Sequence, residues 1–387
     1  MIPYGRQDIS ESDIQAVVDV LHSDFLTQGP AVLAFEMAVA AYCRAQYAVA
    51  VNSATSALHI ACLALGVGPG DWVWTSPNTF VASANCVLYC GASVDFVDID
   101  PHTWNISVPE LRKKLVQAKK EGCLPKVVVP VHFAGQPTEQ EAIWDLAKEY
   151  GFRVLEDGAH AIGASRNGEP VGSCRWSHIT VFSFHPVKII TAGEGGMALT
   201  NDEGLAERMA MLRSHGITRE AGRFLDASLG PWYYEQQMLG FNYRMTDMQA
   251  ALGMSQLVRL GDYIERRNAL ARRYDQALRG LPLQLPTVQA VNRSAFHLYV
   301  VRLIPKATDK VHRQVFESLR QRGIGVNLHY MPVHLQPYYR GLGFAPGQYC
   351  EAEAHGAEAI TLPLYPALTD DQQDVVVSML KEVLADE

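Results

Sequence analysis

Residues 179–196 read ITVFSFHPVKIITAGEGG, and the interpretation of the whole chain starts from this stretch. The apolar run Ile179–Phe182 is typical of a buried strand, and it is followed by a hydroxyl, an imidazole, Lys188 and a glycine cluster. A lysine among apolar segments loses part of its ammonium solvation, so its pKa falls and its free amine can attack a carbonyl. The pattern therefore predicts a Schiff-base lysine, the attachment that pyridoxal 5'-phosphate requires. A surface lysine with its aliphatic stem on apolar neighbours is the alternative.

Strands alternate with helical patterns between Tyr47 and Leu199. This alternation predicts an α/β fold with a mostly parallel sheet and helices on both faces, in three layers. Asp157 stands at the carboxyl end of one of these strands, where such sheets display ligand contacts. We expect its carboxylate to stay ionised and bond the protonated pyridine nitrogen of the cofactor. An aspartate that caps a helix is the alternative.

Small polar residues, Asn52–Ser56, separate the strand Tyr47–Val51 from an apolar helix. Free N–H groups in the first turn of a helix favour an anion, so we expect Ala54 and Thr55 to hold the cofactor phosphate. An ordinary helix cap has the same appearance.

The chain has 387 residues, of which 48% are hydrophobic and 19% charged, enough for two or three domains. We expect a large cofactor-binding domain in residues 1–250. Residues 251–387 should hold a linker helix, part of one long helix from Met248 to about Arg279, and a small C-terminal α/β domain.

Charge and hydropathy exclude several kinds of partner. A net charge of −8 disfavours non-specific nucleic-acid binding. Neither an export signal nor an apolar run of membrane-spanning length is present in the sequence, which predicts a cytoplasmic protein with no membrane partner. Seven scattered cysteines suit reduced thiols, and no motif predicts a metal site.

The motif Ser-x-His-x-x-Lys followed by Gly-Glu-Gly-Gly resembles the lysine motif of the DegT/DnrJ/EryC1/StrS nucleotide-sugar aminotransferases, which have fold type I. The resemblance extends from Ile2 to Tyr330 and is greatest to the aminotransferases of pseudaminic acid synthesis. It implies that Ser183 contacts cofactor and substrate, that Phe80 stacks on the cofactor ring and that His160 supports the cofactor. A core residue is the alternative for Phe80.

The same resemblance implies a homodimer with shared active sites, because Asn242 would reach the cofactor of the neighbouring subunit. Asn242 and Arg244 could each hold a phosphate, or their loop could only fix the start of a helix. The remaining residues that the resemblance places at the substrate, besides Ala54, Ser183, Asn242 and Arg244, are Tyr4, Asp24, Phe25, Leu26, Thr27, His329 and Tyr330. A helix–loop–helix corner is the alternative for 24–27, and an edge strand for 329–330.

The implied reaction moves an amino group from L-glutamate to carbon 4 of a UDP-linked 2-acetamido-2,6-dideoxy-4-keto hexose. Lys188 would also act as the acid and base that moves the proton. A bacillosamine or perosamine precursor is the alternative substrate. A sugar dehydratase of the same fold is disfavoured because such enzymes replace the lysine by histidine, and a non-enzymatic regulator is disfavoured by the intact Asp157, Ser183 and Lys188.

Overall fold

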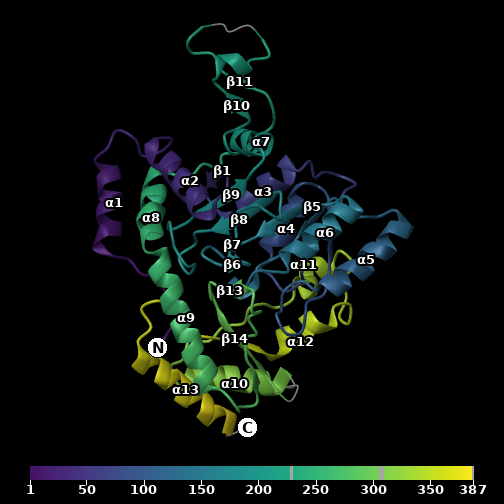
Figure 1. Ribbon diagram of the computed structural model, residues 1–387, viewed down its shortest axis with the longest axis vertical. Coiled ribbons are helices and arrows are strands. Elements are labelled where there is room, and N and C mark those ends of the chain that lie inside the picture. The colour runs from purple at the N-terminus through teal and green to yellow at the C-terminus, as the bar shows by residue number, and fades with distance from the viewer. Residues whose placement is uncertain (227–229, 305–308, 386–387) are drawn as a thin grey trace.

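The computed structural model describes residues 1–226, 230–304 and 309–385. Its centre is a seven-stranded sheet (Figure 1) with the order β1-β9-β8-β5-β4-β2-β3. Only β9 is antiparallel to its neighbours in this sheet, and the other strand pairs are parallel. The strands are β1 (Tyr47–Val51), β2 (Trp72–Thr75), β3 (Ser93–Phe96), β4 (Val127–Val129), β5 (Arg153–Asp157), β8 (Ile179–Ser183) and β9 (Gly196–Thr200). The predicted, mostly parallel α/β sheet is therefore confirmed.

Helices cover both faces of this sheet, which gives the three predicted layers (Figure 1). One face is covered by α3 (Ala54–Ala64), α4 (Ala82–Tyr89) and α7 (Glu203–Arg213). The other face is covered by α2 (Pro30–Cys43), α5 (Val108–Glu121), α6 (Gln140–Tyr150) and α8 (Asp247–Val258). Because β5 and β8 are parallel neighbours, with Asp157 opposite Val181, their carboxyl ends meet at one edge of the sheet.

The C-terminal part contains a small antiparallel sheet, packed against helices around a separate apolar core. Its strands are β12 (Leu283–Gln284), β14 (Tyr299–Leu303) and β15 (Ala359–Leu362), and its helices include α10 (Asp309–Gln321), α11 (Pro337–Arg340), α12 (Cys350–Glu358) and α13 (Asp370–Ala385). Short strands β6 (Ser165–Arg166), β7 (Glu169–Pro170) and β13 (Asn292–Arg293) form a further sheet.

The long helix predicted from Met248 to Arg279 is wrong, because the chain forms two helices, α8 and α9 (Leu260–Ala277), that meet at Arg259. The Arg259 guanidinium pairs with Asp8 and Asp13, and Asp13 lies on the N-terminal helix α1 (Glu11–Leu21). Helix α9 then contributes Ile264 to the core of the large sheet and Leu270 to the core of the small one. The domain boundary near residue 250 stays a prediction.

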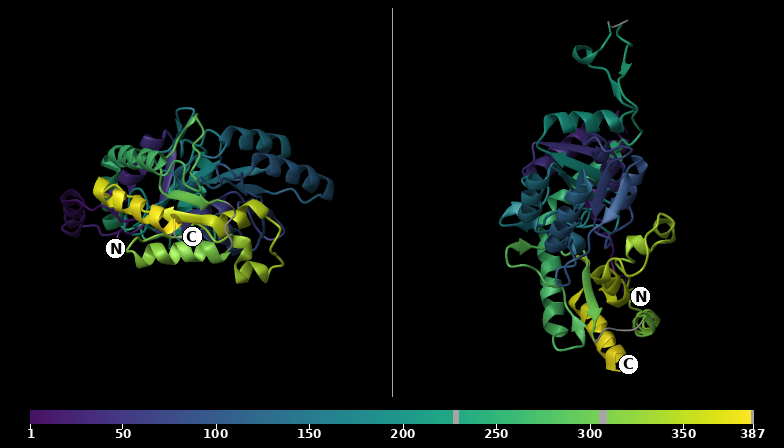
Figure 2. Two further views of the ribbon diagram at one scale, coloured as in Figure 1. Left: turned by 90° about the horizontal axis from the view of Figure 1, so that it is seen from below. Right: turned by 90° about the vertical axis from the view of Figure 1, so that its right-hand side faces the viewer.

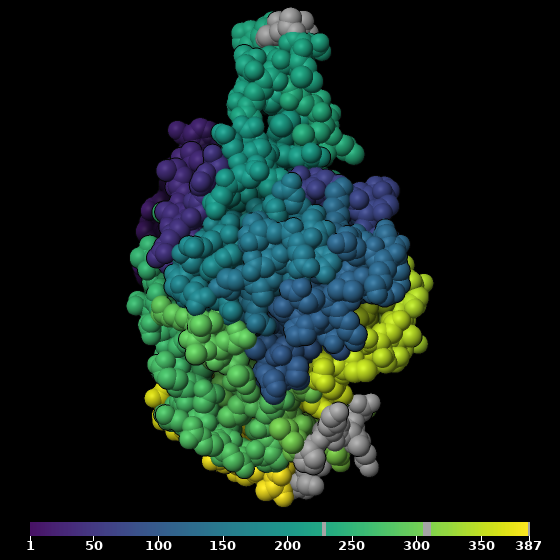
Figure 3. Space-filling view, turned by 45° about the vertical axis from the view of Figure 1, so that its right-hand side comes forward, coloured from purple at the N-terminus to yellow at the C-terminus, as the bar shows by residue number. Residues whose placement is uncertain are grey.

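A narrow arm, defined here as the described residues of 217–236, projects from the body beyond α7 (Figures 2 and 3). Its base is a ladder between β10 (Ile217–Thr218) and β11 (Glu235–Gln236). Leu225 and Trp232 are 80% and 77% exposed on this arm. Among the described residues, no helix is both long and apolar enough to cross a bilayer.

Candidate active site

A cavity of about 910 Å³ opens at the carboxyl ends of β5 and β8. Its walls come from the large sheet, the start of α3, the N-terminal segment and the chain before α11. Ten of the residues proposed from sequence line it: Tyr4, Ala54, Thr55, Phe80, Asp157, His160, Ser183, Lys188, His329 and Tyr330. The structure thus brings together residues that are far apart along the chain.

Lys188 is held by a short looped segment that leaves β8 and returns at β9. The Phe184 N–H donates to Gly195 O at 2.9 Å, the Ala192 N–H donates to Phe184 O at 2.9 Å, and the Lys188 N–H donates to His185 O at 2.9 Å. No side chain of the described residues hydrogen-bonds Lys188 Nζ, and burial lowers the pKa of Lys188 to about 8, although the Asp157 carboxylate opposes that shift. The amine is therefore free and partly neutral near pH 8, as the sequence predicted.

Asp157 faces the same cavity and is 5% exposed. Ser83 Oγ donates to Asp157 Oδ2 at 2.6 Å, and the Ala159 N–H donates to Oδ1 at 3.0 Å. Thr79 Oγ1 in turn lies 2.8 Å from Ser83 Oγ. These bonds fix the plane of the carboxylate, because each of its two oxygens accepts from a donor in a defined position.

The start of α3 borders the cavity with free backbone donors. Ser53 is the N-cap, and its Oγ accepts from the Ser56 N–H at 3.1 Å. The Ala54 and Thr55 N–H groups have no partner among the described residues. Gly196 lies directly beneath this turn, where an added Cβ would stand 2.4 Å from Ser53 C and 2.5 Å from Ala54 N. The glycine cluster of the lysine motif thus lets the sheet approach the helix end.

Aromatic rings and imidazoles form the opposite wall of the cavity. Tyr330 Oη lies 3.1 Å from His160 Nε2, and the two rings are nearly parallel at 19°. Burial lowers the pKa of His160 well below its ordinary value, with further contributions from Lys188 and His329. Phe80 is 58% exposed and lines the cavity, so the core alternative for it is wrong. His329 and Tyr330 are not in an edge strand.

The structure adds residues that the sequence did not single out. The ring of His297 lies 4.4 Å from that of His160, and the Nδ1 atoms of both are buried without a partner among the described residues. Gln249 and Asn327 also line the cavity, and Ser83 reaches Asp157 from α4. No local motif marks His297 or Ser83, since each acts through a residue that is distant in sequence.

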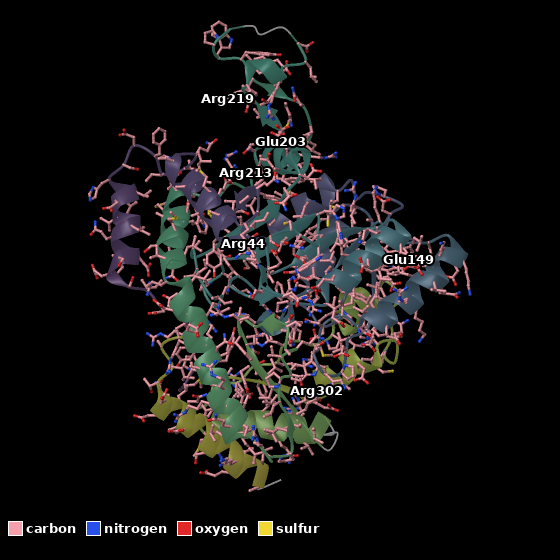
Figure 4. All side chains as sticks on the ribbon, in the orientation of Figure 1. Arg44, Glu149, Glu203, Arg213, Arg219 and Arg302 are labelled. Carbon is pink, nitrogen blue, oxygen red and sulfur yellow. The ribbon has the colours of Figure 1, made fainter. Side chains whose placement is uncertain are left out.

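Six proposed residues do not line this cavity: Asp24, Phe25, Leu26, Thr27, Asn242 and Arg244. Arg244 lines a separate pocket of about 280 Å³ beside Gln28 and Arg213. Thr27 pairs with Thr246, and Asn242 pairs with Ser214, in isolated bridges. Figure 4 labels Arg213 near the base of the arm and Arg219 on the arm itself. These segments belong to the outer surface of the chain.

The donor set of the cavity fits pyridoxal phosphate. A partly neutral amine, a fixed carboxylate and two free N–H groups at a helix start correspond to the aldehyde, the pyridine nitrogen and the phosphate of that molecule. The exposed ring of Phe80 offers an aromatic face.

Comparison with known proteins gives the same result. The DegT/DnrJ/EryC1/StrS aminotransferase family model matches residues 7–381. The spore coat polysaccharide biosynthesis protein SpsC of Bacillus subtilis is 39% identical over 387 residues, covering 99% of this chain and 97% of SpsC.

Two solved structures share the entire fold. The sugar aminotransferase Spr1654 of Streptococcus pneumoniae, described as putative and in its PMP form, superposes with a TM-score of 0.91 at 30% identity, with 100% of both chains covered. Helicobacter pylori PseC, an aminotransferase involved in the biosynthesis of pseudoaminic acid, gives 0.90 at 30% identity, again with 100% of both chains. The chain therefore belongs to the DegT/DnrJ/EryC1/StrS aminotransferase family and is a sugar aminotransferase that depends on pyridoxal phosphate.

Proposed function

We propose that this protein transfers the amino group of L-glutamate to carbon 4 of a UDP-linked 2-acetamido-2,6-dideoxy-4-keto hexose, with Lys188 as the catalytic residue. The observation that carries this proposal is the shared cavity of Lys188, Asp157 and the α3 start. The likeness of the whole chain to PseC supports a substrate sugar of the pseudaminic acid route.

Each residue has a separate task in this proposal. Pyridoxal phosphate, when bound, withdraws electrons from the carbon that carries the amino group. Lys188 Nζ would bind the cofactor, and as a free amine it would take the proton from that carbon and return a proton to the carbon on the other side of the transferred nitrogen. Asp157 keeps the pyridine nitrogen protonated, Ser83 orients Asp157, and Ala54 and Thr55 bind the phosphate through their N–H groups.

The neutral histidines provide donors without extra charge. Tyr330, whose pKa is raised by burial, keeps its proton, and its Oη lies within hydrogen-bond distance of His160 Nε2 at 3.1 Å. Burial and the nearby Lys188 lower the pKa of His329 to about 3, and its Nδ1 lies 2.8 Å from Thr361 Oγ1. An uncharged wall leaves Lys188 as the group that exchanges protons.

We also propose that two copies share each active site. Among the described residues lining the cavity, Lys188 is the only lysine or arginine. A nucleotide diphosphate and the carboxylates of glutamate need more cationic donors than this one amine supplies. Arg244, which lies outside the cavity of its own chain, would supply a cation from the second copy, and Asn242, which also lies outside it, would supply a neutral amide donor. Phe25 and Leu26, which are 52% and 48% exposed, would be covered by the same contact.

The test is a pair of half-reactions with the purified holoenzyme. Glutamate is added, the loss of the absorbance of the Lys188-bound cofactor is followed, and the donor is removed. A panel of UDP- and GDP-linked 4-keto sugars is then added, and the return of the absorbance and the product mass are measured. We expect return with the UDP-linked 2-acetamido sugar of L-arabino configuration. Return with a bacillosamine or perosamine precursor alone would refute the substrate, and no response to glutamate would refute the donor.

A further inference from the structure

We infer that Asp247 is a positioning residue that holds the segment Asp24–Pro30 in the shape needed to contact the nucleotide sugar in the cavity of a second copy. This inference rests on the shared active site proposed above. One buried carboxylate on helix α8 would then determine the conformation of an exposed loop that lies far away in the sequence.

Asp247 is the first residue of α8 and is 1% exposed. Its Oδ2 accepts from the Gly29 N–H and its Oδ1 from the Ala31 N–H, each at 2.9 Å. The Asp247 N–H donates to Leu26 O at 3.0 Å. One residue thus makes three hydrogen bonds, two to the segment Asp24–Pro30 and one to Ala31 directly after it, and the two that its carboxylate accepts are charge-assisted.

The carboxylate also replaces a missing cap. The N-cap of α2 is Gly29, which has no side chain to accept from the first turn of that helix. Asp247 supplies the acceptor from α8, so a single negative charge lies at the positive ends of two helices.

The fit between the two segments leaves no spare room. A Cβ on Gly29 would stand 2.4 Å from Phe25 Cβ and 2.9 Å from Asp247 Oδ1. The backbone of Gly29 has φ −97° and ψ −168°, which any residue adopts, so glycine is needed here for space and not for its dihedral angles. The path of the chain from Phe25 to Gly29 is therefore set by its contact with Asp247.

The same helix start also reaches the cavity of its own chain. Thr246 pairs with Thr27 in an antiparallel bridge and caps α8 together with Gln249. The Thr246 N–H donates to Gln249 Oε1 at 3.0 Å, and Gln249 lines the cavity. The loop is thus anchored to the frame of one active site while its exposed side chains, Phe25 and Leu26, face outward.

The experiment compares Asp247→Asn and Gly29→Ala with wild type in both half-reactions. The amide keeps one acceptor but presents a donor to the second N–H, which leaves a buried group unpaired. We expect the KM for the nucleotide sugar to rise by about ten- to a hundredfold. The rate with glutamate should stay within about twofold, because that donor is too small to need the loop. Gly29→Ala disturbs the same contact from the loop side. It should likewise raise the KM for the nucleotide sugar and leave the rate with glutamate unchanged.

Asp262→Asn is the matched control, since Asp262 is an exposed acid in the first turn of α9 and should change neither constant. Sedimentation should show that both test variants remain dimers. The inference is overturned if the KM for the sugar is unchanged in both variants, or if both half-reactions fall together, or if the dimer dissociates. A wild-type protein that does not respond to glutamate would instead refute the proposed function.

Discussion

The cavity and the outer surface around Asp24–Thr27 are built in contrasting ways. In the cavity, Asp157 and Ser183 are buried and Lys188 is partly buried, and the key carboxylate has its hydrogen bonds within the same chain. On the outer surface, Phe25 and Leu26 are about half exposed, and Arg244 has no hydrogen-bonding partner among the described residues.

This difference separates two kinds of functional residue. Groups that handle the proton and the cofactor need fixed geometry and a low dielectric, and the interior of one chain provides both. Groups that neutralise a large anionic substrate need cations that a buried cavity could not keep charged at low cost. The predictions below test this division, beginning with the largest expected effect.

Lys188→Ala should reduce turnover by about 10³-fold or more, since it removes both the covalent attachment and the proton carrier. The protein should remain a folded dimer, because Lys188 Nζ has no hydrogen-bonding side chain among the described residues. Borohydride reduction followed by peptide mapping should find the cofactor on Lys188 in wild type only. Lys126→Ala, which removes a lysine paired with Asp71 near the surface, is the control. A labelled Lys126 or an active Lys188 variant would contradict the assignment.

Asp157→Asn should lower turnover by about 10²-fold or more while the cofactor still attaches, because the amide has no charge to keep the pyridine nitrogen protonated. Ser83→Ala, which removes the 2.6 Å donor to Asp157, should cost about tenfold. Single-turnover kinetics with glutamate measure both. If Asp157→Asn lowered turnover no more than Ser83→Ala does, the charge of Asp157 would have no role and only its orientation would matter.

Gly196→Ala should weaken cofactor binding by about ten- to a hundredfold, because the new Cβ would push on the backbone of Ser53 and Ala54. The dissociation constant of pyridoxal phosphate, measured by equilibrium dialysis, reports this. Gly261→Ala meets no atom within 4 Å and should leave the constant unchanged. Normal affinity in Gly196→Ala would show that α3 does not hold the phosphate.

Covalent attachment of the cofactor to apo-protein should speed up as the pH rises. The pKa of Lys188 is lowered from 10.5 to about 8, so the neutral amine increases about tenfold per pH unit below 8 and levels off above it. Stopped-flow absorbance between pH 6 and 9 measures this profile. A plateau that begins only near pH 10 would mean that the amine is solvated like an ordinary lysine.

Much of the fold and of the cavity could be predicted from the sequence because the relevant signals are local. The strand Tyr47–Val51 was predicted with its observed bounds. Asp157 is the last residue of a largely buried strand, and Lys188 follows a second strand whose residues are mostly apolar. Parallel neighbours display their carboxyl ends at one edge, so the two residues had to lie close together.

Other features depend on contacts that no local pattern encodes. The break between α8 and α9 occurs without glycine or proline at Arg259, which is drawn to Asp13 on α1. His297 becomes part of the site only because the small sheet places it against His160. Asp247 looks like an ordinary first-turn acid, and its bonds to Gly29 and Ala31 follow from the packing of α2 beside α8.

The contrast between cavity and outer surface can be tested directly by mixing two inactive proteins. If the cavity and Arg244 of one chain serve different active sites, a dimer of Lys188→Ala with Arg244→Ala has one site with both defects and one site with none. Random pairing of equal amounts should then restore about a quarter of the wild-type rate, since half of the dimers are mixed and each has one intact site. The activity of each protein alone should stay near zero.

Mixing Lys188→Ala with Asp157→Ala should restore nothing, because both groups lie in the cavity of the same chain and neither mixed site is intact. No recovery in the first mixture would mean that each chain works alone and that Arg244 has another task. Recovery in the second would mean that Lys188 and Asp157 of one chain do not serve the same active site.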